Sequence, residues 1–320
     1  QMRKAKLKEK LNIIAAELIK TAAARAMREG EKLFVGDNLY EEFCARFAFE
    51  ETEDQLSAIE AVVDDLASGK PMDRLVCGDV GFGKTEVALR AAFIAAISGK
   101  QVAIIAPTTL LARQHMQTFS ARFKDLPLVV RELSRLVSTK DSAQTRAGLA
   151  EGEVDIVIGT HALLSKNISF KRIALVVVDE EQHFGVAHKE RLKNLRNEVH
   201  VLTLTATPIP RTLQMAMTGV RDLSIIATPP VDRLAVRTYV SPFDGVSLRE
   251  ALLREKYRAG QSFIIVPRIS DITEITNFLS DDVPEVRFIT AHGQMSGGDL
   301  EERMTAFYQG TYDILVSTSI

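Results

Sequence analysis

The sequence lacks the features that mark secreted and membrane proteins. It contains only two cysteines, Cys44 and Cys77, among 320 residues, which is too few for a disulfide framework, so we expect two reduced thiols. No apolar run reaches the ~18 residues that a membrane span needs, and no apolar segment follows the basic N-terminus as it would in a secretory signal. We therefore expect a cytoplasmic protein that makes no contact with a membrane.

Metal-ligand spacing and an excess of positive charge are also missing. The six histidines show no ligand spacing with other metal-binding residues, and the pair His183 and His188 is expected to be structural or linked to a nucleotide instead of forming a zinc site. With 40 Lys and Arg against 42 Asp and Glu, the net charge is −2, which excludes a globally basic nucleic-acid binder. Any contact with DNA must come from a local groove.

What the sequence does contain is a phosphate-binding loop. Residues 78–85 match the P-loop pattern G-x-x-x-x-G-K-[ST], between Leu75–Cys77, a predicted buried strand, and a predicted helix from Thr85 to Ile97. Glycines let the backbone wrap a triphosphate with its N–H groups inward, and a helix N-terminus favours an anion. Lys84 would reach the β and γ phosphates, and the Thr85 hydroxyl would hold Mg²⁺. The residues predicted to bind the nucleotide in this loop are Gly78, Asp79, Val80, Gly81, Phe82, Gly83, Lys84 and Thr85.

A carboxylate for the metal follows a second strand. Ala174–Val178 is aliphatic and is predicted to lie inside the sheet, so Asp179 emerges at its carboxyl end, beside the P-loop in a parallel sheet. Asp179 can hold Mg²⁺ there, and Glu180 is placed to polarise the attacking water. The two motifs together predict an enzyme that hydrolyses ATP with Mg²⁺.

The chain is organised as two α/β halves. Strand and helix patterns alternate, which predicts parallel βαβ units. The strand patterns lie at 102–106, 154–158, 175–179, 201–205, 236–240, 263–266, 286–289 and 312–317, and the helical patterns lie at 110–123, 143–150, 246–258, 272–279 and 299–308. Two adjacent prolines, Pro229 and Pro230, indicate a linker. We expect a first lobe at 33–228, a linker at 229–236 and a second lobe at 237–320.

Residues 1–32 form a separate basic segment. It carries nine Lys or Arg and four Asp or Glu, and Leu7, Leu11, Ile14 and Leu18 fall on one helical face. The pattern predicts a basic amphipathic helix. Such a helix could bind DNA or a partner, or it could pack its apolar stripe on its own domain and keep its lysines in water.

Shorter motifs identify the type of motor. Phe49 and Gln55 precede the P-loop strand, where superfamily 2 helicases carry an adenine-recognising Q motif. Ala106–Leu110 resembles motif Ia and Ile158–His161 resembles motif Ib, which touch the DNA backbone in that superfamily. Leu204–Pro208 resembles motif III, whose hydroxyls link the ATP site to DNA. In this order and spacing the motifs resemble a superfamily 2 motor with two RecA-like P-loop lobes.

The longer stretches around these motifs closely resemble the bacterial transcription-repair coupling factor family. The resemblance is carried by Cys77–Ala88, Asp179–Val186, Leu202–Leu213 and Thr290–Met295. RecG-type branch-migrating helicases are a related family that shares Gly-Asp-Val-Gly and Thr-Pro-Ile-Pro-Arg. Glu181 and Gln182 after the first two acidic residues, and Phe82 in the P-loop, favour the coupling factor.

The resemblance implies an ATP-driven translocase on double-stranded DNA that displaces stalled RNA polymerase and promotes nucleotide-excision repair. The contacts with the polymerase and with the repair proteins would lie in regions outside this chain. Ile314–Ile320 resembles the start of motif V, after which the family continues with an arginine motif that faces the γ phosphate. We therefore expect a truncated second lobe and weak hydrolysis by the chain alone.

The resemblance also gives candidate roles to single residues. Phe49 and Gln55 would bind adenine. The candidate catalytic residues are Lys84, Glu180 and Gln182. Thr205 and Thr207 would couple the nucleotide to DNA. The candidate DNA contacts are Thr108, Thr109, Thr160, His161, Arg268 and His292. Arg268 could equally be a surface arginine beside Pro267.

Two other functions stay open. A fork-remodelling helicase of the RecG type would use the same motor with a different N-terminal wedge domain. A nucleotide-gated DNA clamp would use ATP only to order a DNA-binding surface. An intact Glu180 argues against the clamp, although a chain without the arginine motif would fit it.

Overall fold

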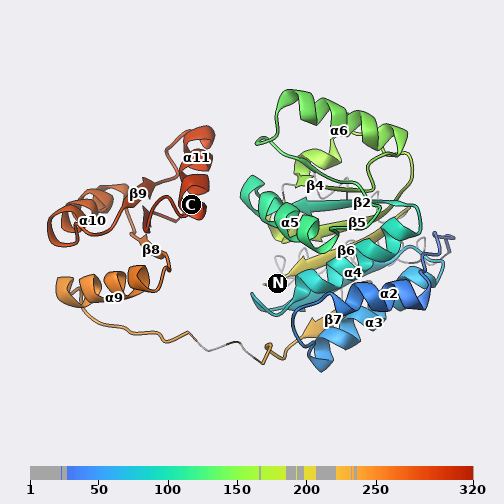
Figure 1. Ribbon diagram of the computed structural model, residues 1–320, viewed down its shortest axis with the longest axis horizontal. Helices are drawn as coiled ribbons and strands as arrows, with labels where there is room; N and C mark the ends of the chain where they lie inside the picture. The colour runs from blue at the N-terminus through green and yellow to red at the C-terminus, as the bar shows by residue number, and fades with distance from the viewer. Residues whose placement is uncertain are drawn as a thin grey trace, which may run out of the picture. The chain divides into compact units, whose positions relative to one another are not determined.

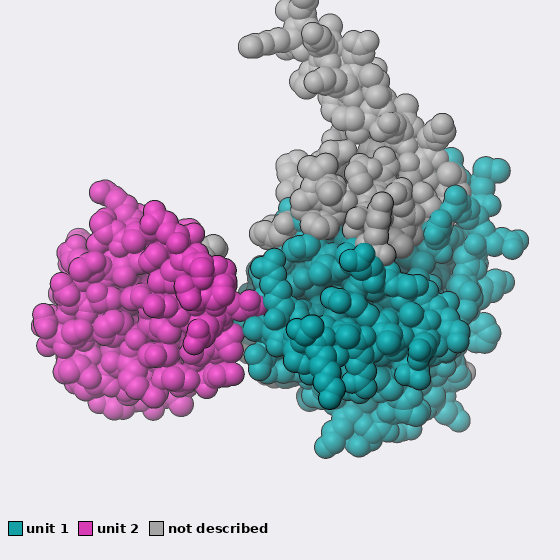
Figure 2. All heavy atoms as spheres, turned by 90° about the horizontal axis from the view of Figure 1, so that it is seen from above, with its two compact units in different colours: residues 1–234 teal, residues 235–320 magenta. Residues whose placement is uncertain are grey.

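The chain folds into two compact units, Gln1–Leu234 and Ala235–Ile320, which are coloured separately in Figure 2. The computed structural model describes residues 23, 27–165, 167–184, 192, 198–206, 221–231, 233 and 236–319. Each unit has its own sheet and its own apolar core. Most of the predicted amphipathic helix at 1–32 lies outside the described residues, and so does Thr207.

The first unit contains a seven-stranded sheet in which neighbouring strands are parallel. Its strands lie in the order β3-β4-β2-β5-β6-β1-β7. The labels of β4, β2, β5, β6 and β7 follow one another from top to bottom in Figure 1. Their bounds are β1 Asp73–Gly78, β2 Gln101–Ala106, β3 Val130–Leu133, β4 Ile156–Thr160, β5 Ile173–Asp179, β6 His200–Thr205 and β7 Asp222–Ile226. The α/β fold with a parallel sheet, predicted from the alternating patterns, is confirmed.

Helices cover both faces of this sheet. Their bounds are α2 Asp37–Ala45, α3 Glu53–Ala67, α4 Lys84–Ile97, α5 Thr109–Arg122 and α6 Thr139–Glu151. The apolar side chains of α3, α4 and α5 pack on one face, and Leu149 of α6 packs on the other. Ile104 of β2 belongs to the first core and Ile105 to the second, as expected for a strand that is buried on both faces.

The two edge strands, β3 and β7, are not predicted by the sequence patterns. The sequence of β3 is VREL, with two charged residues, and β7 begins with Asp222 and alternates between exposed and buried positions. An edge strand pairs on one side only and needs no continuous aliphatic run. The predicted central strands, in contrast, agree with β2, β4, β5 and β6 to within two residues at each end.

The second unit is built on a smaller parallel sheet of three strands in the order β8-β10-β9. Its elements are α9 Gly245–Tyr257, β8 Ser262–Ile265, α10 Ile269–Asp282, β9 Phe288–Ala291, α11 Gly297–Tyr308 and β10 Ile314–Ser317. Leu252 of α9 and Leu279 of α10 pack on one face, and Phe307 of α11 packs on the other. All six elements overlap the predicted ones.

One predicted strand of the second half is wrong. Residues 236–240 form no strand, and the side chain of Val240 is 98% exposed. Val236 and Tyr239 are also exposed. Branched and aromatic residues favour a strand only where a partner strand and a core cover them, and neither sheet includes this segment.

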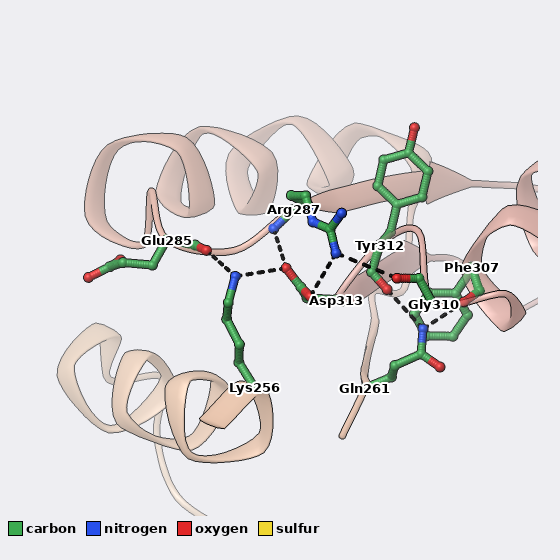
Figure 3. Close-up of polar contacts among 8 residues, drawn as sticks. All are labelled: Lys256, Gln261, Glu285, Arg287, Phe307, Gly310, Tyr312 and Asp313. Carbon is green, nitrogen blue, oxygen red and sulfur yellow. Dashed lines mark hydrogen bonds and ion pairs between the residues drawn. The ribbon is translucent and has the colours of Figure 1, made fainter. Parts of the chain in front are cut away.

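A polar cluster fixes the start of β10 (Figure 3). Asp313 accepts hydrogen bonds from the N–H of Arg287 at 2.8 Å and from Nζ of Lys256 at 3.0 Å. Burial alone would raise the pKa of Asp313, but these donors hold it below its ordinary 3.8. Gln261 donates to the carbonyl of Tyr312 at 2.8 Å. The cluster ties α9 and the residue before β9 to β10.

The cysteines and the lengths of the helices bear on the expectations of reduced thiols and of no membrane span. Cys44 and Cys77 are both free thiols, and burial raises the pKa of each. Among the helices that the structure describes, none is both long and apolar enough to cross a bilayer.

His200, the first residue of β6, makes folding sensitive to pH. Its Nδ1 accepts a hydrogen bond from the N–H of Met72 at 3.1 Å, and its Nε2 donates to the carbonyl of Glu31 at 2.8 Å, so the buried ring is neutral. Burial lowers the pKa of His200 below its ordinary 6.5. The unfolded chain therefore takes up the proton first as the pH falls through 6.5, and the free energy of unfolding decreases below that pH.

We predict that His200→Asn loses less stability than the wild type between about pH 7.5 and about pH 5.5. Asn can supply an acceptor oxygen near the position of Nδ1, and it does not take up a proton in this range. Urea unfolding at both pH values measures the two differences. If the variant and the wild type lose the same free energy of unfolding between the two pH values, His200 is not buried and neutral as described.

Candidate functional site

The predicted motifs meet at one edge of the seven-stranded sheet. Because neighbouring strands are parallel, their carboxyl ends lie together, with Ala106 paired to Thr160 and Thr205 paired to Cys77. Five neighbouring strands, in the order β4, β2, β5, β6 and β1, each end in one of the predicted motifs. These motifs are, in the same order, motif Ib, motif Ia, the acidic motif, motif III and the P-loop. Ligands of open parallel sheets bind at this edge.

The P-loop joins β1 to α4 in a backbone shape that favours glycine at two positions. Gly81 has φ +79° and Gly83 has φ +77°, in the left-handed region that other residues rarely adopt. A Cβ on Gly83 would lie 2.3 Å from Nε2 of Gln55, and one on Gly78 would lie 3.0 Å from the carbonyl oxygen of Ile226. The loop is thus closely packed between α3 and β7.

Lys84 is folded back onto this loop. Its Nζ donates to the carbonyls of Gly78 at 2.6 Å and Asp79 at 2.9 Å. Burial lowers the pKa of Lys84, against the opposing effect of the carboxylates of Glu180, Asp179 and Asp79. The ammonium therefore lies inside the loop, where a phosphate could replace the two carbonyls as its partner.

The N-terminus of α4 has no side-chain cap. Hydroxyls cap the neighbouring helices α3, α5 and α6, whereas Gly83 precedes α4 and has no side chain to offer. The N–H groups of this first turn and the positive end of the helix dipole suit an anion. Thr85 lies in the same turn.

The two predicted adenine residues flank the start of α3. Gln55 is buried, accepts from the N–H of Thr52 at 2.9 Å and donates through Nε2 to the carbonyl of Phe82 at 2.9 Å. Phe49 is 68% exposed, with its ring 5.5 Å from that of Phe47. Gln55 therefore supports the P-loop directly, while Phe49 presents an aromatic surface on which a flat base could stack.

Glu180 is joined to motif III. It has φ +50°, which is uncommon for a residue with a side chain. Its carboxylate accepts hydrogen bonds from the hydroxyl of Thr205 at 3.1 Å, from the N–H of Ala206 at 2.9 Å and from Nε2 of Gln182. The structure thus brings together three residues that the sequence singled out separately, Glu180, Gln182 and Thr205.

Asp179 is partnered by His115, which the sequence motifs do not single out. Nε2 of His115 lies 2.8 Å from Oδ2 of Asp179, and the two side chains are 9% and 13% exposed. His115 lies on α5 in the buried stripe that also contains Ala112 and Phe119. A polar residue at the apolar spacing of a helix is the one sequence signal that could have indicated it.

Arg221, just before β7, is a second residue that the motifs miss. Its Nε lies 2.9 Å from Oδ1 of Asp73, one terminal nitrogen lies 3.2 Å from Glu181, and the other donates to the hydroxyl of Thr203. A buried guanidinium needs such partners. Because these partners are distant in the sequence, no local pattern could have indicated the group.

The candidate DNA residues of the first unit follow β2 and β4. Thr108 is exposed and caps α5, accepting from the N–H of Leu111 at 3.2 Å, and Thr109 is the first residue of that helix. Thr160 is buried at the end of β4, and His161 begins the short 3₁₀ helix η1, His161–Leu164. The four candidates thus come from two neighbouring strand ends.

The two remaining candidates lie in the second unit. Arg268 follows β8, is exposed and occupies the N-cap position of α10. His292 directly follows β9 and is partly buried, and its Nδ1 has no hydrogen-bond partner among the described residues. Both therefore lie at the carboxyl edge of the second sheet.

The oxygens at the edge of the first sheet fit a divalent cation beside a phosphate. His115 contacts Oδ2 of Asp179, while Oδ1 accepts no hydrogen bond within the part of the chain that the structure describes. Mg²⁺ binds through one or two carboxylates together with phosphate oxygens. Asp179 and the Thr85 hydroxyl are the protein oxygens that could hold it.

Comparisons with known families agree with this geometry. Residues 52–216 match the family described as DEAD/DEAH box helicase, and residues 246–320 match the helicase conserved C-terminal domain. The first match covers more than half of the sequence, and the chain belongs to the DEAD/DEAH box helicase family.

Transcription-repair-coupling factors are among the similar proteins. The factor of Rickettsia bellii is 52% identical over 100% of this chain and 29% of its own length. The factor of Escherichia coli K12 is 50% identical over 98% of this chain and 27% of its own length. A solved structure of RecG bound to a three-way DNA junction is 34% identical, with a TM-score of 0.80, over 97% of this chain and 42% of that one. The chain thus spans less than a third of these coupling factors, and the resemblance inferred from the motifs is confirmed.

Gly83 and Gly99 form a matched pair for testing the packing of the P-loop. Their φ angles are +77° and +76°, so alanine costs a similar backbone strain at both, on the order of 1 kcal/mol. Only at Gly83 would the methyl group collide with Gln55, since nothing lies within 4 Å at Gly99. We predict that Gly83→Ala lowers the free energy of unfolding, measured in urea, by more than Gly99→Ala does. Equal losses would contradict the close contact between the loop and α3.

Proposed function

We propose that this chain is the motor part of a transcription-repair coupling factor, an ATP-driven translocase on double-stranded DNA. Identities near 50% to coupling factors over nearly the whole chain support the particular family. The observation that carries the motor function is the hydrogen bonding of Glu180 to Thr205 and Ala206, because it connects the residue proposed to act on water with the strand beside the P-loop. Residues 33–228 and 237–320 would be the two motor lobes, joined by a linker at 229–236.

The nucleotide is proposed to be ATP with Mg²⁺. Lys84 would exchange its carbonyl partners for the β and γ phosphates, and Thr85 and Asp179 would hold the metal ion, which supplies charge neutralisation at the phosphates. Phe49 would stack on adenine, with Gln55 beside it. This assignment is supported by the uncapped first turn of α4 and by the position of Asp179 at the same sheet edge.

Hydrolysis is proposed to depend on the orientation of Glu180. Its carboxylate would position and polarise the attacking water. The carboxylate of Glu180 accepts hydrogen bonds from Thr205 and Gln182, which favour the arrangement seen in the structure. These two residues, together with Thr207 of motif III, would couple the state of the nucleotide to DNA.

The proposed DNA site lies beside the nucleotide site on the first sheet. Thr108, Thr109, Thr160 and His161 would contact the backbone there. Arg268 and His292 are the DNA contacts proposed for the second unit. The name of the RecG structure, which describes a bound DNA junction, supports DNA as the ligand. RNA polymerase and excision-repair proteins would bind to regions outside this chain, and the protein would act in the cytoplasm.

A fork-remodelling helicase of the RecG type is the second candidate. The TM-score of 0.80 to RecG favours it, while identities near 50% to coupling factors, against 34% to RecG, favour the first proposal. The two differ in the partner that the whole protein acts on. Displacement of a stalled RNA polymerase by the full-length protein would support the coupling factor, and regression of a model replication fork without such displacement would support the helicase.

Substitutions at Lys84 and Glu180 separate nucleotide binding from hydrolysis. Lys84→Ala removes the charge that meets the phosphates, so the affinity for Mg·ATP, measured by calorimetry, should fall by about tenfold or more.

Glu180→Gln keeps the shape of the side chain and the metal ligand Asp179. It should therefore bind Mg·ATP, while DNA-stimulated turnover in the full-length protein falls about 100-fold or more. Normal affinity in the first variant, or normal turnover in the second, would contradict the assigned roles.

Duplex binding should be a property of a local site, since the chain as a whole carries a net charge of −2. We expect affinity that falls steeply with salt and does not depend on base sequence, because the contacts are to the backbone. Fluorescence anisotropy with two unrelated duplexes over a salt series measures both properties. A strong preference for one duplex, or no binding to either at low salt, would contradict the proposal.

A further inference from the structure

The contact between His115 and Asp179 joins α5 to the proposed metal ligand. A carboxylate only accepts hydrogen bonds, so Nε2 of His115 donates to Oδ2 over 2.8 Å. Oδ1 of Asp179 accepts no hydrogen bond among the described residues. The histidine therefore determines which carboxylate oxygen is left for a metal ion.

The ring of His115 is held in place by its own helix. It stands edge-on to Phe119, with an interplanar angle of 84° and a centroid distance of 6.5 Å. Ala112 and Phe119, on the same face of α5, are fully buried in the core. The ring therefore lies against a buried side chain of its own helix, and a movement of α5 carries the ring with it.

The far end of α5 is fixed to α4, the helix that follows the P-loop. Arg122 donates to Glu86 on α4 at 2.9 Å and lies 4.5 Å from the ring centroid of Phe43. Glu86 is buried and also accepts from Arg90 at 2.9 Å, and Arg90 pairs with Glu51. Together with the contact of His115, this ion-pair network attaches α5 to the P-loop helix and to the acidic strand.

The near end of α5 begins at the candidate DNA residues. Thr108 caps the helix, and Thr109 is its first residue. His115 lies within two turns of them on the same rigid element. A shift of the first turn on DNA contact would therefore reach Asp179 through one side chain and one hydrogen bond.

We propose that His115 is a positioning residue that orients Asp179 for Mg²⁺ and thereby links DNA contact at the start of α5 to the metal site. The proposal rests on the proposed function, since it assumes that Asp179 holds the metal. Groups that hydrogen-bond to metal ligands typically change metal affinity by about 10- to 100-fold when they are replaced.

The test uses three substitutions at His115 and a control beside it. His115→Leu removes the donor but keeps an apolar body in the core. His115→Gln places an amide nitrogen near the position of Nε2, and His115→Asn carries the same donor on a shorter side chain. Gln114→Ala is the matched control, because Gln114 is the preceding, exposed residue of the same helix.

The first measurement is the affinity for a fluorescent ADP analogue, in excess EDTA and along a titration with Mg²⁺. We expect His115→Leu and His115→Asn to raise the Mg²⁺ concentration at half-maximal effect by about tenfold or more, with unchanged affinity in EDTA. His115→Gln should recover most of the loss, and Gln114→Ala should match the wild type. A loss caused by general damage to the fold would appear in EDTA as well and would not be recovered by Gln.

The second measurement repeats the Mg²⁺ titration with saturating duplex DNA in the full-length protein. Duplex DNA should shift the Mg²⁺ concentration at half-maximal effect for the wild type. It should leave that concentration unchanged for His115→Leu. If the Mg²⁺ titrations of His115→Leu, His115→Asn and the wild type superimpose, the proposed role of His115 is wrong, while the proposed function is unaffected. A wild type whose nucleotide affinity does not respond to Mg²⁺ would overturn the proposed function and this inference with it.

Discussion

The hydrogen bonds that the end of β6 and the following residue, Ala206, make to Glu180 are the constraint on which the rest of the site depends. The backbone of Glu180 lies at φ +50°, a conformation that costs on the order of 1 to 3 kcal/mol for a residue with a side chain. Its N–H donates to the carbonyl of Leu204 at 2.9 Å, while Thr205 and Ala206 hold its carboxylate. The end of β6 therefore fixes both the main chain and the side chain of the acidic residue, and hydrogen bonds to a charged group are strong enough, at about 1.5 to 3 kcal/mol each, to offset the strain.

The position of β6 explains why this contact matters for function. It lies between β5, which ends in Asp179, and β1, which leads into the P-loop. Its register brings Thr205 beside Cys77, and a slip of one residue would turn its side chains to the opposite face. Arg221 adds a second connection, from Asp73 at the start of β1 to Glu181 after β5. The phosphate loop, the acidic residues and motif III are thus one mechanically connected group.

Features that depend on local sequence could be predicted, and features that depend on distant contacts could not. The P-loop and the central strands follow from glycine spacing and aliphatic runs, which act within a few residues. The edge strands β3 and β7 contain charged residues, and among the described residues each pairs with a neighbouring strand on one side only. Residues 236–240 have strand-like composition but no partner strand in either described sheet. The roles of His115 and Arg221 depend on partners brought close by the fold, and no motif contains them. The resemblance to the Q motif predicted that Gln55 binds adenine, but it could not indicate the hydrogen bond from Gln55 to the carbonyl of Phe82.

A crystal structure of the protein with Mg²⁺ and a non-hydrolysable ATP analogue would show whether these residues hold the nucleotide. We predict that Nζ of Lys84 leaves the carbonyls of Gly78 and Asp79 for the β and γ phosphates. We also predict that Thr85 and Asp179 hold the metal ion, and that the carboxylate of Glu180 faces the γ phosphate while Thr205 still donates to it. A nucleotide bound away from the first turn of α4, or a Glu180 released from β6 and turned away from the phosphates, would show that these roles are wrong.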